Sequence, residues 1–72
     1  MKEVKYIKTS EDEIIVFSAL QKHSEFKSFN PVSAGFIDLG ELNCYGYSVS
    51  LGLHSDEKED SLLAKIQFGG SI

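Results

Sequence analysis

The sequence predicts an α+β fold in which an antiparallel sheet of about four strands carries a C-terminal helix packed on one face. Two observations lead to this prediction. Short runs rich in β-branched and aromatic residues are separated by polar turn segments, as in Val4–Lys8 and Ile14–Phe17. Near the end of the chain, residues 57–68 begin with acidic residues and continue with apolar residues at helical spacing. In chain order the elements read ββαββα, which is two hairpin-plus-helix units.

The length of 72 residues limits how much core the chain can build. It allows one domain, residues 1–72. A domain of this size buries about 60% of the surface that its unfolded chain exposes, and its core supplies roughly 3–5 kcal/mol. The single cysteine excludes a disulfide within the chain. Association with a second copy is the simplest remaining way to bury more surface, so a homodimer is a secondary expectation.

The first half of the chain predicts a hairpin followed by a short helix. The hairpin joins Val4–Lys8 to Ile14–Phe17 through the polar loop Thr9–Glu13. The second strand is apolar on both faces, so we expect it in the centre of the sheet with a helix over one side. Ser18 is a suitable N-cap for one or two helical turns over residues 19–26.

The second half predicts two more strands and the most strongly marked helix. Pro31 opens a third strand, which alternates from Val32 to Leu39, and Gly40–Glu41 fits a tight reversal of type II′. The fourth strand spans Leu42–Leu53 and needs a kink, for which Gly46 is the expected place. Beyond the kink, apolar and small residues alternate strictly.

Small residues occupy strand positions where bulky side chains are usual, in residues 32–37 and 44–53. Glycine inside a strand marks a bulge, a bend or the close approach of another backbone. We therefore expect sheet curvature or close packing there and no phosphate-binding loop, since neither glycine-rich phosphate motif occurs.

The last helix has clear boundaries in the sequence. Ser55 or Asp56 can cap its start, and Asp56 with Glu59 has capping-box spacing. The acidic residues of its first turn complement the positive end of the helix dipole. Gly69–Gly70 is a typical helix stop.

Composition excludes several classes of function. The net charge is −4 and all seven basic residues are lysines, which argues against direct binding of nucleic acid. The N-terminus has no apolar export segment, and the longest apolar run, Ile14–Phe17, is far too short to span a bilayer. With one free thiol and no export signal, we expect a cytoplasmic protein that does not bind membranes.

Three side chains could carry chemistry if they met in space: Cys44, His23 and His54. Structural zinc needs four ligands with paired spacings, and a cysteine nucleophile needs a histidine base and a lowered thiol pKa. The sequence shows neither pattern. It therefore predicts no catalytic residue, no metal site and no cofactor, with a small enzyme or ligand-binding protein that uses these residues as the alternative.

Two groups of side chains suit contact with a protein partner. Tyr45 and Tyr47 share one face of their predicted strand, and tyrosine is enriched in binding hot spots. The second group is the acidic start of the last helix, which can meet a basic partner. Its members are Asp56, Glu57, Glu59 and Asp60. The sequence thus predicts a non-catalytic protein-binding module, with a structural homodimer subunit as a further alternative.

The segments His23–Glu25, Val32–Phe36 and Cys44–Leu51, followed by an acidic helix start, give a chain that resembles small uncharacterised proteins of bacteria and their phages. The resemblance covers most of the chain. It implies a short accessory or phage-borne protein that binds a host protein and inhibits or modulates it. It carries over no catalytic residue.

Overall fold

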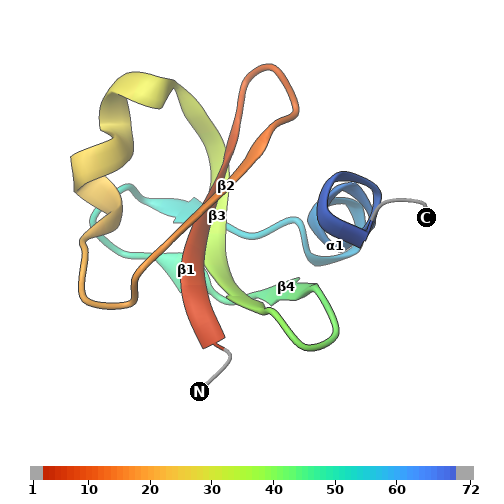
Figure 1. The fold of residues 1–72 in the computed structure, drawn as a ribbon. Helices are drawn as coiled ribbons and strands as arrows, with labels where there is room; N and C mark the ends of the chain where they lie inside the picture. The colour runs from red at the N-terminus through yellow and green to blue at the C-terminus, as the bar shows by residue number, and fades with distance from the viewer. Residues whose placement is uncertain (1–2, 70–72) are drawn as a thin grey trace.

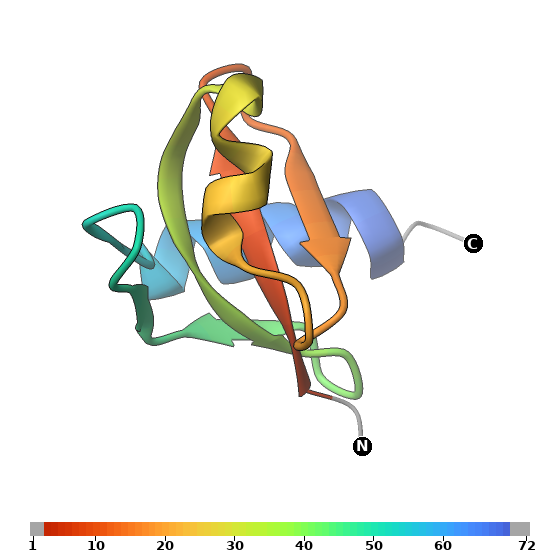
Figure 2. The same cartoon turned by 90° about the vertical axis from the view of Figure 1, so that its left-hand side faces the viewer.

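The computed structural model describes residues 3–69, which form a four-stranded antiparallel sheet between two helical layers. The strand order is β2-β1-β3-β4, and a two-stranded ribbon, β5-β6, follows. Figures 1 and 2 show the first helix on one face of the sheet and the C-terminal helix on the other. The elements are β1 (Glu3–Thr9), β2 (Ile14–Phe17), the 3-10 helix η1 (His23–Phe29), β3 (Pro31–Asp38), β4 (Asn43–Tyr45), β5 (Tyr47–Ser48), β6 (Leu53–His54), α1 (Glu57–Ala64) and the π-helical turn η2 (Lys65–Gly69). The predicted α+β class, with its antiparallel sheet and C-terminal helix, is confirmed.

The core consists of two apolar clusters, one on each face of the sheet, because successive side chains of a strand point to opposite faces. In β1, Tyr6 faces α1 and Ile7 faces η1, and both are fully buried. The cluster under α1 contains Tyr6, Ile14, Ile37, Cys44 and Ala64. The cluster under η1 contains Ile7, Phe17 and Ala34. Burying one such large apolar side chain contributes roughly 1.5–3 kcal/mol, so both faces stabilise the fold.

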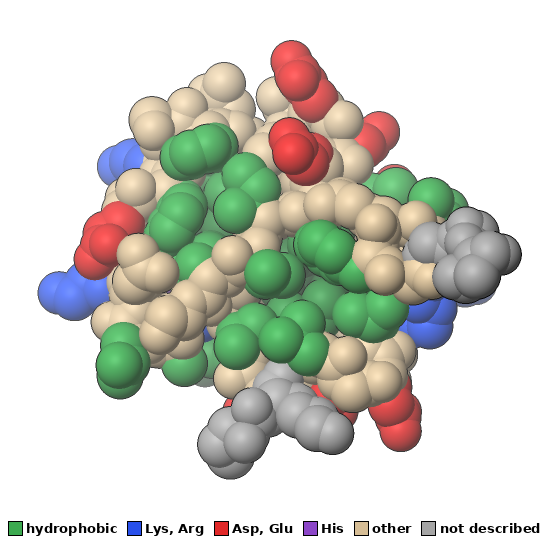
Figure 3. Space-filling view, viewed as in Figure 1, with side chains coloured by type: hydrophobic (Ala, Val, Ile, Leu, Met, Phe, Trp, Pro, Cys, Tyr) green, Lys and Arg blue, Asp and Glu red, His purple; other side chains and the backbone are tan. Residues whose placement is uncertain are grey.

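The prediction that the second strand is central is wrong, because β1 takes that place and β2 lies at the edge. Its two-sided apolar pattern has another cause. Ile14 packs in the cluster under α1 and Phe17 in the cluster under η1, so helices cover both faces of an edge strand. Figure 3 shows apolar side chains on either side of a tan band of backbone and uncharged polar side chains.

The first helix begins later than predicted. It spans His23–Phe29, not residues 19–26, and Lys22 precedes it without a side-chain cap. Ser18 instead closes a turn, since its hydroxyl accepts a hydrogen bond from the amide of Leu20 at 3.0 Å. The ring of Phe26 stacks on Phe17 with centroids 4.0 Å apart, and this contact fixes where the helix lies.

The predicted fourth strand is divided into three pieces. The kink at Gly46 is confirmed, with φ at +81°. The regular alternation beyond it belongs to a turn and not to a strand: the amide of Gly52 donates to the carbonyl of Ser48 at 2.9 Å, and residues 49–52 connect β5 to β6. The reversal near Gly40 occurs where expected but is not of type II′, because Leu42 has the positive φ, at +58°.

α1 begins as predicted, with the Asp56 carboxylate accepting from the amide of Glu59. The regular helix ends at Ala64 and continues as the turn η2, so the predicted end at residue 68 falls within η2. Of the predicted stop, Gly69 lies in η2 and Gly70 lies outside the described residues. No helix within residues 3–69 is both long enough and apolar enough to cross a membrane.

Side chains from the C-terminal segment bond to the outer edges of the sheet. The Gln67 amide group accepts from the N–H of Ile14 at 2.9 Å and donates to its carbonyl at 2.7 Å. At the other edge, the N–H of Cys44 donates to the hydroxyl of Ser61 at 2.8 Å. Both β2 and β4 are therefore bonded to the helical layer through their backbone.

A fully buried carboxylate, that of Asp60, ties α1 to the sheet. One of its oxygens accepts from the hydroxyls of Tyr6 and Ser33, the latter at 2.7 Å, and from the amide of Asp56 at 3.1 Å. The other oxygen faces the ammonium group of Lys8 at 3.2 Å. Burial by itself would raise the pKa of Asp60, but these hydrogen bonds outweigh burial and hold the pKa below its ordinary value. Likewise burial would lower the pKa of Lys8, and the bond to Asp60 raises it instead.

Gly35 lets the backbone after β4 lie close to β3. A Cβ atom built at this position would stand 2.3 Å from the carbonyl oxygen of Tyr45 and 3.2 Å from the backbone of Gly46. Any side chain would force the two segments apart. The close approach of another backbone, expected from the small residues of this region, is confirmed here.

Replacing Ser33 by Ala removes one donor to the Asp60 carboxylate. We expect the free energy of unfolding at neutral pH to fall by about 1.5–3 kcal/mol, the usual range for a bond to a charged group. A carboxylate with a lowered folded pKa stabilises the fold above its unfolded value, here near 3.8, and this contribution is lost as the pH falls through the folded pKa. The variant has a higher folded pKa, so its acid unfolding begins at higher pH. Urea titration and acid titration followed by circular dichroism measure both effects. The exposed Ser10→Ala is the control, and equal behaviour of the two variants would contradict the prediction.

Replacing Gly35 by Ala places a methyl group against the Tyr45 carbonyl. Overpacking of this kind costs about 1–3 kcal/mol, so we expect the urea midpoint to fall clearly at neutral pH. Gly69→Ala is the matched control, because a Cβ atom there meets only the end of the Leu42 side chain at 3.7 Å. Equal midpoints for the two variants would show that the backbones can move apart without loss.

Candidate functional site

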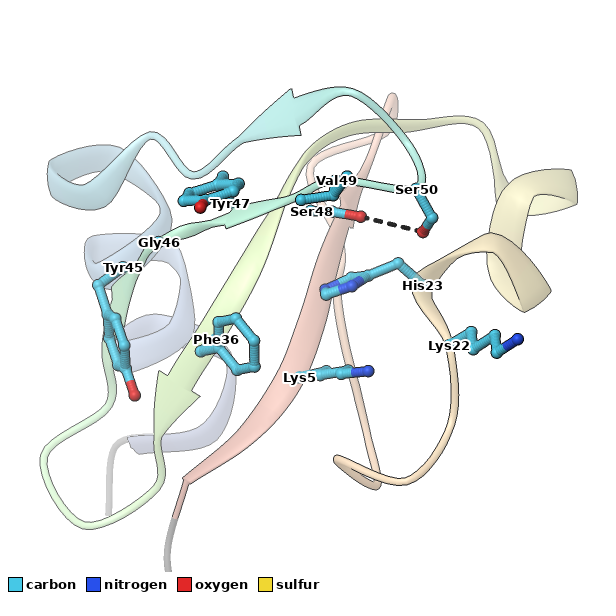
Figure 4. A pocket seen from close by; sticks show the side chains of 10 residues that line it. All are labelled: Lys5, Lys22, His23, Phe36, Tyr45, Gly46, Tyr47, Ser48, Val49 and Ser50. Atoms are coloured by element: carbon cyan, nitrogen blue, oxygen red, sulfur yellow. Dashed lines mark hydrogen bonds between the residues drawn. The ribbon is translucent and has the colours of Figure 1, made fainter.

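An open hollow of about 540 Å³ lies where the connection from β4 to β5 passes over β3, and we call it the aromatic groove (Figure 4). Figure 4 shows Tyr45 and Tyr47 toward one end and Lys22 at the other, and the middle contains Phe36, Lys5 and His23. The lining residues are Lys5, Lys22, His23, Phe36, Tyr45, Gly46, Tyr47, Ser48, Val49 and Ser50. The groove thus combines segments that are distant in the sequence.

Stacked rings form the floor of the groove. Phe36 and Tyr45 face each other across β3 and β4, with centroids 6.0 Å apart and planes at 25°. Tyr45 is half-buried, and its hydroxyl is shielded from solvent without a hydrogen-bond partner among residues 3–69. The packing on Phe36 therefore sets its orientation. Tyr47 follows the kink at Gly46 and pairs with His54 across the ribbon, with ring centroids 5.9 Å apart.

His23 lines the groove, and contacts with neighbouring residues fix the position of its ring. Its Nε2–H donates to the carbonyl of Gly35 at 2.9 Å, and Phe17 and Phe36 meet the ring edge to face. Burial lowers the pKa of His23, and the charge of Lys5 acts in the same direction. The imidazole is therefore neutral at pH 7 and serves as a rigid part of the wall.

The charge at the groove comes from two lysines. The ammonium group of Lys5 donates to the carbonyl of Gln21 at 2.8 Å, which holds it near the rim, and Lys22 is exposed. Among the described residues 3–69, none that lines the groove is acidic, although the chain as a whole carries a net charge of −4. The groove is thus a cationic and aromatic surface on an acidic protein.

The three side chains that could carry chemistry do not meet. Cys44 belongs to the cluster under α1, His23 lies on the opposite face of the sheet, and His54 is exposed on β6. Burial, and next the charge of Asp60, raise the pKa of the Cys44 thiol to about 11. Within residues 3–69, no three His, Cys, Asp or Glu side chains are grouped as metal ligands. The arrangement gives the alternative prediction, a small enzyme or ligand-binding protein built on these residues, no geometric support.

The acidic residues predicted to contact a partner are divided by the fold. Asp56, Glu57 and Glu59 are exposed at the start of α1. Asp60 has no exposed surface, because it points into the sheet toward Tyr6, so it is not available at the protein surface and must be removed from the predicted contact set.

A second hollow, of about 690 Å³, runs between β4 and α1. Glu57 and Lys58 line it together with Tyr45, so Tyr45 borders both hollows. The fold therefore brings Tyr45 and Tyr47 together in the aromatic groove and places Glu57 on the other side of Tyr45. Sequence patterns did not indicate Lys5, Lys22 or Phe36, because only tertiary packing brings these residues to the tyrosines.

Comparison with known proteins gives no match to a family model, to a curated protein or to a solved structure. The resemblance to small bacterial and phage proteins therefore stays a prediction.

Burial of Cys44 predicts an unreactive thiol. Raising its pKa from 9.0 to about 11 lowers the thiolate fraction at neutral pH about 100-fold, and burial limits access further. We expect labelling by a maleimide to be at least about 100-fold slower in the folded protein than in denaturing urea. Rapid and selective labelling of the folded chain would instead favour a reactive cysteine.

Proposed function

We propose that this protein is a non-catalytic protein-binding module and that the aromatic groove is its main contact surface. The observation that carries the proposal is a concave surface with exposed apolar side chains above a rigid aromatic floor. Tyr47 is 56% exposed and Val49 is 81% exposed at its rim. Tyrosine is enriched in binding hot spots, and the exposed apolar side chain of Val49 beside Tyr47 can help to cover it from water when a partner binds.

The aromatic floor of the groove supports the proposal because its rings are already held in place in the free protein. The stacked pair Phe36 and Tyr45, and the bond from His23 to Gly35, hold the groove open in the free protein. A preformed site loses little conformational entropy when a partner binds, which leaves more of the contact energy as affinity.

The acidic start of α1 extends the proposed contact surface beyond Tyr45. Asp56, Glu57 and Glu59 add negative charge on the far side of this ring, where they can meet a basic rim on the partner. The proposed role in the cell follows the resemblance to small bacterial and phage proteins: an accessory protein that inhibits or modulates a host protein in the cytoplasm.

A second candidate is a homodimer subunit, and one observation favours it. Leu62, Ile66 and Phe68 follow one another along α1 and η2 and are 59%, 66% and 44% exposed. Sedimentation across a concentration series separates the two candidates, because a strict monomer at high concentration excludes the homodimer.

The proposal predicts that the double variant Tyr47→Ser, Val49→Ser loses its partner. Removing a hot-spot tyrosine together with the apolar side chain beside it typically costs about 2 kcal/mol or more, or roughly 30-fold in affinity. Immobilised wild-type and variant proteins are compared for capture from cell lysate by quantitative mass spectrometry. Leu20→Ser is the matched control, since Leu20 is 94% exposed and lies outside the groove. The relevant partner is one that the control retains and the double variant loses. Equal capture by all three proteins would overturn the proposal.

A further inference from the structure

We propose that the aromatic groove binds an acidic peptide segment of its partner, in which an apolar side chain stands beside carboxylate groups. This inference rests on the proposed function and adds the chemistry of the segment that is bound.

The charge of the groove opposes the charge of the rest of the chain. Lys5 and Lys22 supply two ammonium groups, and in the described part of the chain no residue that lines the groove is acidic. His23 stays neutral because burial lowers its pKa, so it adds no positive charge to the groove. The bond to the Gln21 carbonyl uses one of the three ammonium hydrogens of Lys5, which leaves donors for a carboxylate.

The placement of the side chains in the groove suits a peptide segment that carries both an apolar side chain and a carboxylate group. Figure 4 shows Tyr45 and Tyr47 toward one end and Lys22 at the other, with Phe36 and Lys5 between them. An apolar side chain can cover Phe36 and Tyr47 while a neighbouring carboxylate reaches Lys5. A basic segment would instead bring like charges together, which is unfavourable.

The surface beside the groove favours a peptide over a nucleic acid strand as the ligand. Tyrosines beside lysines also suit stacked bases, but a phosphate backbone needs a continuous cationic path. Beyond Tyr45 the surface carries Glu57, and Asp56 and Glu59 are exposed on the same helix start. These carboxylates repel an extended chain of phosphates, whereas a short acidic segment can end before it reaches them.

The chain has no tryptophan, so a tryptophan in a probe peptide reports binding without background at its own emission. The probe is the capped peptide Asp-Glu-Trp-Leu-Asp-Glu, titrated with the full chain at low and at high salt. We expect saturable binding that weakens with salt. The variant Lys5→Gln, Lys22→Gln should bind roughly fivefold more weakly, the effect of two exposed ion pairs. Lys22→Gln alone leaves the bond from Lys5 to Gln21 intact and should show a smaller loss. Lys27→Gln, an exposed lysine outside the groove, should bind like the wild type.

Several outcomes would overturn the inference. These are equal binding of the matched peptide Lys-Lys-Trp-Leu-Lys-Lys, an unchanged affinity of the double lysine variant, or no saturable binding of the acidic probe up to about 1 mM. Tighter binding of a deoxythymidine oligonucleotide would assign the groove to single-stranded nucleic acid, and equally tight binding of free indole-3-propionate would assign it to small aromatic acids. If the acidic probe fails while Tyr47→Ser, Val49→Ser still loses a captured protein, the inference is wrong and the proposed function stands. If that variant also keeps every captured protein, the proposed function itself is wrong.

Discussion

The buried carboxylate of Asp60 is the interaction on which the rest of this structure depends. Removing a carboxylate from water costs several kcal/mol unless hydrogen bonds and an opposite charge replace its hydration. Here Tyr6 and Lys8 come from β1 and Ser33 comes from β3, so the compensation exists only when both strands present these residues to α1. A shift of one residue in either strand would turn them to the opposite face. The carboxylate therefore specifies the strand register as well as the position of the helix.

The same strand register also determines how the aromatic groove is built. When β1 and β3 are aligned in this way, Gly35 lies beneath the carbonyl of Tyr45, and its own carbonyl accepts the bond from His23. Gly35 thus contacts both the backbone of the segment that carries Tyr45 and the ring of His23. The kink at Gly46 then carries Tyr47 over the floor that Phe36 and Tyr45 form.

Local patterns predicted those parts of the fold that are determined by neighbouring residues. The β1–β2 hairpin, the cap at Asp56 and the kink at Gly46 follow from turn chemistry, capping chemistry and backbone freedom. The division of the fourth strand could not be foreseen in this way. Alternating serine and apolar residues fit a strand, but they equally fit a turn in which the Ser48 hydroxyl accepts from the amide of Leu51.

The candidate site was predictable in part. Tyr45 and Tyr47 could be selected because tyrosines on a strand with few charges favour contact with partners. The burial of Asp60 could not be foreseen, since an acidic residue in the first turn of a helix is usually explained by the helix dipole alone. Its hydrogen-bond partner Tyr6 lies 54 positions away in the chain. A long separation in sequence also explains why Lys5 was not predicted, because it joins Tyr45 and Tyr47 in the groove only after the sheet has formed.

The bonds from Gln67 to Ile14 and between Ser61 and Cys44 affect whether another strand can be added to this sheet. An incoming strand extends a sheet by pairing with free main-chain groups along an edge. At both margins of this sheet the C-terminal segment already occupies some of these groups, namely the N–H and carbonyl of Ile14 and the N–H of Cys44. A strand added at either margin would therefore have to displace the side-chain bonds at Ile14 or at Cys44 before it could pair along the whole edge.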